Sequence, residues 1–511
     1  MIVADQIARA VTRFPDAIAV VCGDERYSFR GLERRTTQLA NALTALGLVR
    51  GDRVACLLRN SIRCVEVDFA LAKTGLVRVS LNPKCTAKEL RYILTDSGAR
   101  ALIADSVFDL LMVGAADVLP ACLIRIGGRT EDAPKTLQYE ELVNNASAAP
   151  IELRFDAEEL YCLFYTSGTT GRPKGVMLSH RAILQIAFNL LMDVGPKELG
   201  EKILLMQPMS HGAGFFVLPW FMRGGTLIIM REFDPIEVLR LMRDEAIETV
   251  KLIPTMIQRL LRIEGTSPED FPRLKQMIYG ASPMPTPALR EALVKFGPKL
   301  IQIYGQSEAA VTITTLPIVD HDPEGAHAHR LASAGIPFST VVIGIVDDED
   351  RELPAGEAGE VVVRAPHVMS GYWNLPDLSA KTVRGGWLHT SDYGRIDEDG
   401  YLYLLGRKDE MIISGGYNIA PFEVEEALYL HPAVQEAAVV GEPDLEWGSV
   451  VVAYVALRTP VPSREIVDFL QPHLGFKRPK RVHILAELPK NSNGKIQKSA
   501  LRPELALKQD S

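Results

Sequence analysis

Short apolar runs alternate with amphipathic stretches along the first two-thirds of the chain. The run at 53–58, for example, is followed by a stretch with helical spacing at 63–76 and then by a second run at 77–80. Further apolar runs, separated by helix-like stretches, lie at 101–104, 202–206, 226–230, 249–253 and 300–303. Alternation of strands and helices is typical of layered folds with largely parallel sheets. The pattern therefore predicts an α/β fold for this part of the chain.

The pattern changes after about residue 325. Short apolar runs at 341–346, 359–364 and 401–405 are separated by polar turns, and the Asp399-Gly400 pair is a strong hairpin signal. This part of the chain is therefore predicted to form a small antiparallel unit.

A third pattern begins after Gly406. Strand-like runs lie at 411–413, 437–440 and 450–455, with helical spacing at 422–430 and 463–474. About one hundred residues are enough for an independent small domain. We therefore expect a compact α+β module here, with its boundary between Gly406 and Asp409.

Composition narrows the class of protein. The chain has 511 residues, more than one hydrophobic core usually organises, and its 47% hydrophobic and 23% charged residues exclude a disordered protein. A net charge of −8 gives no general attraction for nucleic acid, so no such partner is expected. The N-terminus lacks signal-peptide features, the most apolar stretch (215–230) is interrupted and too short to span a bilayer, and the six cysteines form no CxxC pair. These features predict a cytoplasmic protein without a transmembrane segment and with reduced thiols.

The densest chemical signal is the segment at 165–175, Tyr-Thr-Ser-Gly-Thr-Thr-Gly-Arg-Pro-Lys-Gly. Glycines let a backbone approach an anion closely, and N–H groups, hydroxyls and a lysine can contact phosphate oxygens. It is not a Walker A loop, because Gly-x-x-x-x-Gly-Lys-Ser/Thr is absent from the chain. The alternative is an ordinary polar surface loop, but the density of phosphate-binding groups favours a phosphate site.

This segment resembles the phosphate loop of adenylate-forming enzymes, the superfamily of acyl- and aryl-CoA ligases, luciferases and peptide-synthetase adenylation domains. Further motifs of the superfamily follow in order at 279–285, 304–308, 387–392, 406–409 and 489–496. The chain departs from the usual pattern at Ser307, where threonine is common; serine keeps the hydroxyl and loses a methyl group. The resemblance extends from about residue 5 to Leu501.

The resemblance implies a role for each matching residue. The ATP phosphates would be held by Thr166, Ser167, Gly168, Thr169, Thr170, Lys174 and Ser307. The adenine and acyl pockets would be lined by Gly280, Ala281, Ser282, Tyr304 and Gly305, and the ribose would contact Asp392 and Arg407. Glu308 would act in catalysis by holding Mg²⁺, because a hard cation prefers carboxylate oxygen. Asp409 would be the hinge, and Lys495 the catalytic lysine. In isolation Glu308 and Lys495 would be read as solvated surface residues, and the ordered set of motifs favours the catalytic reading.

The resemblance also implies an architecture and a reaction. Residues 1–406 would form a large N-terminal domain of layered α/β subdomains plus a small β-barrel, followed by a hinge at 407–409 and a mobile α+β C-terminal domain at 410–511. The reaction would use ATP and Mg²⁺ to convert a carboxylic acid into an acyl-adenylate with release of pyrophosphate, and then form a thioester with release of AMP. A non-catalytic nucleotide-binding homologue is the alternative from a different class of function.

The identity of the thiol rests on a second resemblance. The segments at 414–421, 446–448 and 476–481 resemble the C-terminal domain of 4-chlorobenzoate-CoA ligases. This implies that Trp447, Phe476 and Arg478 contact the nucleotide of coenzyme A, while Gly415 and Gly416 border the pantetheine tunnel. Stacking and cation–phosphate pairing suit a nucleotide on an open surface. A solvated basic face is the alternative for 476–481, and a ligase that loads a carrier protein is the alternative for the whole chain.

The acid itself is less well specified. By resemblance His211 lies between the acyl pocket and the thiol path, where it would orient the carboxylate or gate the thiol; a structural histidine is the alternative. The Phe-Asp-x-Ser pattern of amino-acid-activating domains is absent, which favours a small carboxylic acid without an amino group. Lys251 interrupts an apolar strand and is expected to snorkel towards solvent, but if it faces the pocket, a polar group or a second carboxylate on the substrate would follow. The oligomeric state, including a homodimer, stays open.

Overall fold

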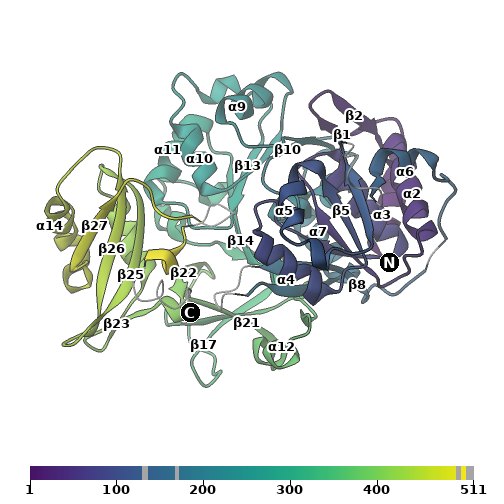
Figure 1. Ribbon diagram of the computed structural model, residues 1–511. Helices are drawn as coiled ribbons and strands as arrows, with labels where there is room; N and C mark the ends of the chain where they lie inside the picture. The colour runs from purple at the N-terminus through teal and green to yellow at the C-terminus, as the bar shows by residue number, and fades with distance from the viewer. Residues whose placement is uncertain (129–135, 153, 167–171, 491–495, 502–511) are drawn as a thin grey trace.

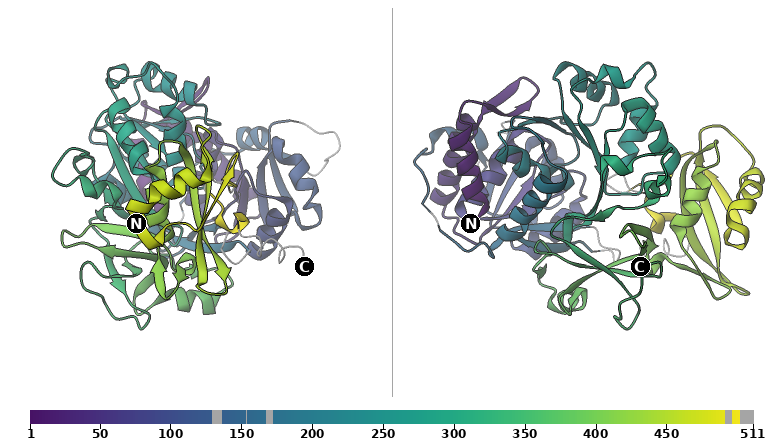
Figure 2. Two further views of the ribbon diagram at one scale, coloured as in Figure 1. Left: turned by 90° about the vertical axis from the view of Figure 1, so that its left-hand side faces the viewer. Right: turned by 180° about the vertical axis from the view of Figure 1, so that it is seen from behind.

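The computed structural model describes residues 1–128, 136–152, 154–166, 172–490 and 496–501. Two large sheets with their helices make up most of the molecule, a small antiparallel sheet lies beside them, and a C-terminal unit lies at one end (Figures 1 and 2). Among the described residues no helix is long and apolar enough to cross a membrane.

The first large sheet has nine strands within the described part of the chain. In spatial order they are β16 (Ile336–Pro337), β15 (Ala309–Leu316), β14 (Leu300–Gln306), β13 (Gln276–Gly280), β12 (Thr249–Leu252), β10 (Lys202–Leu205), β11 (Thr226–Ile229), β1 (Ile18–Cys22) and β2 (Glu25–Ser28). All neighbours from β14 to β1 are parallel. The carboxyl ends of these strands therefore meet at one edge of the sheet, the usual place for a binding site in an open α/β sheet.

The second large sheet has eight strands among the described residues. They are β19 (Gly371–Tyr372), β9 (Lys174–Ser179), β8 (Leu160–Thr166), β4 (Val77–Ser80), β3 (Arg53–Leu57), β5 (Ala101–Asp105), β6 (Cys122–Ile126) and β7 (Leu137–Gln138). The strands from β8 to β7 are parallel, whereas β9 returns antiparallel beside β8. This return brings Lys174 opposite Thr166.

Helices cover both faces of the large sheets. They are α1 (Val3–Arg13), α2 (Phe29–Ala45), α3 (Ile62–Thr74), α4 (Ala87–Ser97), α5 (Asp109–Val113), α6 (Tyr139–Asn145), α7 (His180–Asp193), α8 (Val217–Met222), α9 (Pro235–Asp244), α10 (Pro254–Leu261) and α11 (Thr286–Phe296). Their ends follow local rules: α9 begins at Asp234, whose side chain accepts a hydrogen bond from the Glu237 N–H, with proline at the first helical position. One hydrophobic core, formed with α1, α3, α7 and α8, contains residues from both large sheets.

The third sheet is antiparallel, and its strands come after β16 in sequence. Its strands are β17 (Val342–Val346), β18 (Ala358–Arg364), β20 (Val383–Arg384), β21 (Trp387–Ile396) and β22 (Leu402–Arg407), with α12 (Pro376–Thr382) beside them. The hairpin between β21 and β22 turns at the Asp399-Gly400 pair, as predicted.

The C-terminal unit has a hydrophobic core of its own. It contains the hairpin β23 (Ile412–Ser414) and β24 (Tyr417–Ile419), the sheet β25 (Val434–Asp444), β26 (Gly448–Leu457) and β27 (Arg481–Leu485), and the helices α13 (Pro421–Tyr429) and α14 (Ser463–Leu474). The predicted fold class is confirmed: layered α/β sheets, a small antiparallel sheet and an α+β C-terminal unit.

Candidate active site

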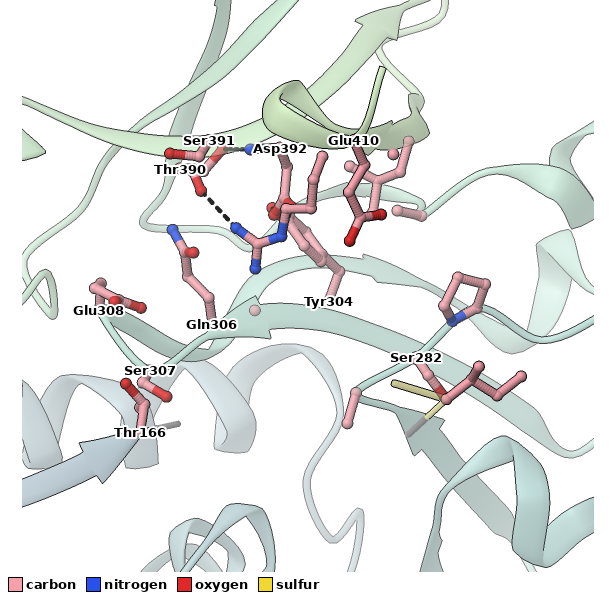
Figure 3. A pocket seen from close by; sticks show the side chains of 18 of the residues that line it. Thr166, Ser282, Tyr304, Gln306, Ser307, Glu308, Thr390, Ser391, Asp392 and Glu410 are labelled. Atoms are coloured by element: carbon pink, nitrogen blue, oxygen red, sulfur yellow. Dashed lines mark hydrogen bonds and ion pairs between the residues drawn. The ribbon is translucent and has the colours of Figure 1, made fainter. Parts of the chain in front are cut away.

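A cleft of about 1140 Å³ lies where the large sheets, the antiparallel sheet and the C-terminal unit meet. Its lining comes from the carboxyl ends of β13 and β14, from β8 and β9, from β21 and β22, and from the C-terminal residues Lys490, Ile496 and Lys498. Figure 3 shows Thr166, Ser307 and Glu308 near one another, Tyr304 and Asp392 in the middle of the cleft, and Ser282 on a separate loop. The cleft is of the size that encloses small-molecule ligands.

Tyr304, Asp392 and Arg407 form a hydrogen-bonded group in the cleft. The Tyr304 hydroxyl donates to Asp392 Oδ2 at 2.5 Å, and Arg407 Nε lies 2.9 Å from Asp392 Oδ1. Strand pairing places Asp392 on β21 directly opposite Arg407 on β22, so the hairpin fixes the ion pair. Burial and the neighbouring Asp392 carboxylate raise the pKa of Tyr304 well above its usual value, so the phenol keeps its proton and remains a donor.

Glu308 lies at the end of the cleft near Thr166 and Ser307 (Figure 3). Its carboxylate accepts a 2.6 Å hydrogen bond from the Tyr372 hydroxyl, and Lys174 Nζ lies 5.5 Å from the centre of the Tyr372 ring. Burial, followed by the nearby Glu308 carboxylate, raises the pKa of Tyr372. Tyr372 thus lies close to both a carboxylate and a lysine.

The donor set here fits Mg²⁺. Within the part of the chain that the structure describes, no cluster of three His, Cys, Asp or Glu side chains could hold a metal ion. Mg²⁺ is usually bound through one or two carboxylates together with substrate phosphates and water, and Glu308 offers one such carboxylate in the cleft.

The predicted phosphate loop is described only at its two ends. Thr166 and Lys174 both line the cleft and are paired across β8 and β9. Ser167, Gly168, Thr169 and Thr170 lie outside the described residues, as does Lys495. The segment that contains Lys495 is flanked by Lys490 and Ile496, which line the cleft and form a bridge with each other.

Close backbone contacts explain the two glycines of the adenine motifs. A Cβ at Gly280 would lie 2.2 Å from the Ile303 carbonyl oxygen, and one at Gly305 would lie 2.6 Å from the Val311 nitrogen. Only glycine fits such contacts. Ala281 follows with a positive φ of 74°, and with Ser282 it lines the cleft beyond the end of β13.

His211 lies between the main cleft and a small cavity of about 20 Å³. Its Nδ1 is 2.9 Å from the Ser210 hydroxyl, and its ring packs edge-on against Phe164 with centroids 5.3 Å apart. The small cavity also borders the ion pair between Arg78 and Asp68, whose atoms approach to 2.7 Å. This volume is enough for about one water molecule.

The C-terminal unit contacts the rim of the cleft. Thr286, at the start of α11, donates a 3.0 Å hydrogen bond to Glu426 on α13. Lys498 Nζ lies 2.7 Å from Glu425 and 3.4 Å from Glu410, which is next to Asp409. Asp409 itself is exposed and lines the cleft directly after β22. These contacts tie α13 and the segment that follows residues 491–495 to the rim of the cleft.

The residues expected to contact coenzyme A gather on another surface of the C-terminal unit. None of Gly415, Gly416, Trp447, Phe476 and Arg478 is among the residues that line the cleft. The Gly415 N–H donates to the Trp447 carbonyl at 2.9 Å, and a Cβ at Gly415 would lie 2.7 Å from the Trp447 ring. Phe476 packs against Tyr417, the residue that follows Gly416, with ring centroids 4.9 Å apart. Trp447 and Phe476 are 43% and 58% exposed, so they present an open aromatic surface.

Lys251 does not snorkel, and that expectation is wrong. Its side chain is buried, with 3% exposure, and its ammonium donates to the neighbouring Leu252 carbonyl at 2.7 Å. Successive side chains of a strand point to opposite faces of the sheet. Val250 and Leu252 pack in a core on one face, so Lys251 points to the other face, next to Phe216. Neighbouring strands and Phe216 therefore enclose the Lys251 ammonium.

Sequence reasoning missed several residues of the site. Tyr372, Glu410, Thr286 and Glu426 all line the cleft or contact its rim. Each is far in sequence from its partner: Tyr372 reaches Glu308 because β19 pairs with β9, a pairing of two-residue length that no local pattern indicates. For Thr286 alone the sequence gives a local signal: Pro285 and Pro287 on either side of it indicate the start of a helix.

Comparison with known proteins gives a family. Residues 7–373 match the model described as AMP-binding enzyme, and residues 423–495 match the AMP-binding enzyme C-terminal domain. A fatty acid–[acyl-carrier-protein] ligase of Streptomyces coeruleorubidus is 35% identical over 96% of this chain and 93% of its own length. A feruloyl-CoA synthase of Amycolatopsis sp. is also 35% identical, over 96% of both chains. The crystal structure of ATP-bound MatB from Rhodopseudomonas palustris superposes with a TM-score of 0.89 at 30% identity over 99% of both chains.

Proposed function

This chain belongs to the AMP-binding enzyme family of adenylate-forming ligases, and we propose that it activates a carboxylic acid with ATP and then transfers the acyl group to coenzyme A. The observation that carries the proposal is the cleft itself. Four segments distant in sequence bring Thr166 and Lys174, Glu308, Asp392 and Arg407 to one cavity. Hydroxyl, lysine, carboxylate and guanidinium groups in that arrangement suit a nucleoside triphosphate.

In the first step a carboxylate oxygen attacks the α-phosphorus of ATP, a P–O bond forms, and pyrophosphate leaves. Asp392 would accept hydrogen bonds from the ribose hydroxyls, with Arg407 and Tyr304 fixing its orientation. Thr166 and Lys174 would contact the phosphates from β8 and β9. Mg²⁺ held by Glu308 would supply charge neutralisation when bound. Most of the acceleration would come from alignment and from charges that are already in place.

Lys495 is proposed to bridge the acid carboxylate and the α-phosphate. It lies outside the described residues, and support comes from its neighbours in sequence: Lys490 and Ile496 both line the cleft. His211 would lie beside the reacting carboxylate, because it borders the cleft next to Phe164.

In the second step the thiolate sulfur attacks the acyl carbon, a thioester forms, and AMP leaves. The predicted coenzyme A residues Trp447, Phe476 and Arg478 do not line the cleft that Lys490 and Ile496 line. A rotation of residues 410–511 about Asp409 would move the surface with Lys490 and Ile496 away from the acyl carbon and bring the surface with Trp447, Phe476 and Arg478 to it. Large dihedral changes at a few residues are a common way to move a domain.

A carrier-protein thiol is the second candidate acceptor. The relative from Streptomyces coeruleorubidus acts, by its name, on an acyl-carrier protein, whereas the Amycolatopsis relative is named for a CoA thioester. The exposed rings of Trp447 and Phe476, with Lys480 Nζ 5.2 Å from the Trp447 ring, favour a phosphorylated nucleotide with a stackable base.

The test is release of pyrophosphate from ATP over a panel of fatty, aromatic and dicarboxylic acids, with and without coenzyme A. We expect acid-dependent release with Mg²⁺ present, and an acyl-CoA product with coenzyme A alone. If pyrophosphate is released but no acyl-CoA forms, and an acyl-carrier protein restores thioester formation, the acceptor is the carrier protein. Binding of ATP without release for any acid would indicate a non-catalytic homologue.

A further inference from the structure

Lys251 is a buried cation that has no ionic partner among the described residues. Among the described residues no carboxylate pairs with its ammonium, and one of its three N–H groups is used, in the hydrogen bond to Leu252. The Phe216 ring lies 5.8 Å from Nζ. Burial alone lowers the pKa of Lys251 to about 7, because no neighbouring charge favours the ammonium. An ammonium in such surroundings is costly unless a partner offsets it.

Strand register places Lys251 behind the cleft. Lys251 on β12 is paired with Ile278 on β13, which is paired with Ile301 on β14. Two residues further towards the carboxyl edge, and therefore on the same sheet face, the next row contains Ile303, which lines the cleft. Lys251 is thus one row of side chains deeper than the cleft wall, on β12 between β10 and β13.

The residues opposite Lys251 connect it to the reacting end of the cleft. Phe216 closes the short helix Gly212–Phe216, which begins directly after His211. His211 lines the cleft where the reacting carboxylate is proposed to lie. An acid that enters past His211, between this helix and the sheet, would therefore direct its far end towards Lys251.

Resting on the proposed function, we propose that Lys251 determines specificity by pairing with a second carboxylate at the far end of the substrate, so that the acid is a dicarboxylic acid. A distal carboxylate would supply the missing counter-charge and accept the two unused N–H groups. A methyl group at the same position would leave the ammonium unpaired. No bond to Lys251 changes during the reaction; it binds the substrate and takes no part in the chemistry.

The test compares straight-chain dicarboxylic acids with monocarboxylic acids of the same carbon number. Wild-type protein, Lys251→Met, Lys251→Arg and the control Ile278→Val are assayed for pyrophosphate release. Ile278 is the neighbour of Lys251 on the same sheet face, so its variant reports damage to the core in general. We expect Lys251→Met to lower kcat/KM for the preferred dicarboxylic acid at least tenfold and to spare or improve the monocarboxylic acid. Lys251→Arg should retain part of the preference, and Ile278→Val should change both acids by the same factor.

Two measurements make the inference independent of turnover. Calorimetric titration of the free acids should show tighter binding of the dicarboxylic acid to wild type than to Lys251→Met. At pH 6, below the Lys251 pKa of about 7, the Tm of Lys251→Met without ligand should exceed that of wild type, because the variant no longer buries a protonated amine. A wild-type preference for monocarboxylic acids, or an equal effect of Lys251→Met on both acids, would overturn the inference while pyrophosphate release still supported the proposed function. Selective dicarboxylate binding without pyrophosphate release would instead contradict the proposed function alone.

Discussion

The hydrogen bond between Thr286 and Glu426 gives a prediction about the first half-reaction. It joins α11 of the large part of the molecule to α13 of the C-terminal unit. Thr286→Val removes the donor and keeps the shape of the side chain. Loss of a hydrogen bond to a charged group costs about 1.5–3 kcal/mol, and about 1.4 kcal/mol corresponds to a factor of ten. If the bond holds the C-terminal unit at the cleft, Thr286→Val should slow adenylation about tenfold.

The effect should depend on pH. Burial raises the pKa of Glu426 to about 7, the Thr286 hydrogen bonds oppose this shift, and Glu425 adds to it. A raised carboxyl pKa means that the docked unit is most stable when Glu426 is protonated and loses stability as the pH rises through about 7. The Thr286 donor offsets part of that loss only when the carboxylate is ionised. The ratio of wild-type to variant adenylation rates should therefore be small at pH 6 and approach tenfold at pH 8.5.

The assay separates the two half-reactions. Pyrophosphate release measures adenylation, and thioester formation from supplied acyl-adenylate measures the second step, which the variant should spare. Thr266→Val is the matched control, because the Thr266 hydroxyl bonds only the nearby Ile263 carbonyl among its described partners. An equal loss in both half-reactions, or a ratio that does not change with pH, would refute the reasoning. In a Glu426→Gln background the pH dependence of the ratio should disappear.

Four further variants test other parts of the structure. Lys495→Ala should abolish pyrophosphate release yet spare thioester formation from supplied acyl-adenylate; equal loss of both would remove its proposed role. Asp409→Pro should slow thioester formation far more than adenylation, and equal rates would contradict a rotation at this residue. Asp392→Asn weakens charge-assisted bonds of about 1.5–3 kcal/mol, so kcat/KM for ATP should fall at least tenfold; the Tm is measured alongside, because the variant also removes the charge that pairs with Arg407. Glu66→Gln should destabilise folding by about 3–5 kcal/mol in urea titrations, because fully buried Glu66 pairs with Arg35 at 2.5 Å; a midpoint equal to wild type would show that the pair contributes nothing.

Local pattern was enough to predict most of the fold. Alternating apolar runs located seven of the parallel strands but not β1, β6, β7, β8 or β13. The Asp399-Gly400 pair located the hairpin that sets Asp392 opposite Arg407. These features depend on residues that are neighbours in sequence. The glycines at 280 and 305 matched family motifs, but the reason for glycine, the close approach of Ile303 and Val311, became visible only in the folded sheet.

Contacts between distant segments could not be predicted in this way. Tyr372 reaches Glu308, and Glu426 reaches Thr286, only after the sheets and the C-terminal unit have packed. Lys251 shows the opposite failure: a lysine on a strand was expected to extend to water, but neighbouring strands and Phe216 enclose it. Side-chain direction along β12 could be predicted from its sequence, whereas the position of β12 inside a nine-stranded sheet could not.

The ion pair between Arg407 and Asp392 also has a mechanical consequence. Arg407 ends β22 and is tied to β21 both through Asp392 and through its 3.0 Å hydrogen bond to the Thr390 carbonyl. Two residues before the proposed pivot, the backbone is therefore anchored to a rigid hairpin. A rotation that starts at Asp409 would leave Arg407 in place at the nucleotide, while residues further along the chain travel along arcs that lengthen with their distance from the pivot. The same guanidinium could then hold AMP through both half-reactions, and the intermediate would not need to be released and recaptured between them.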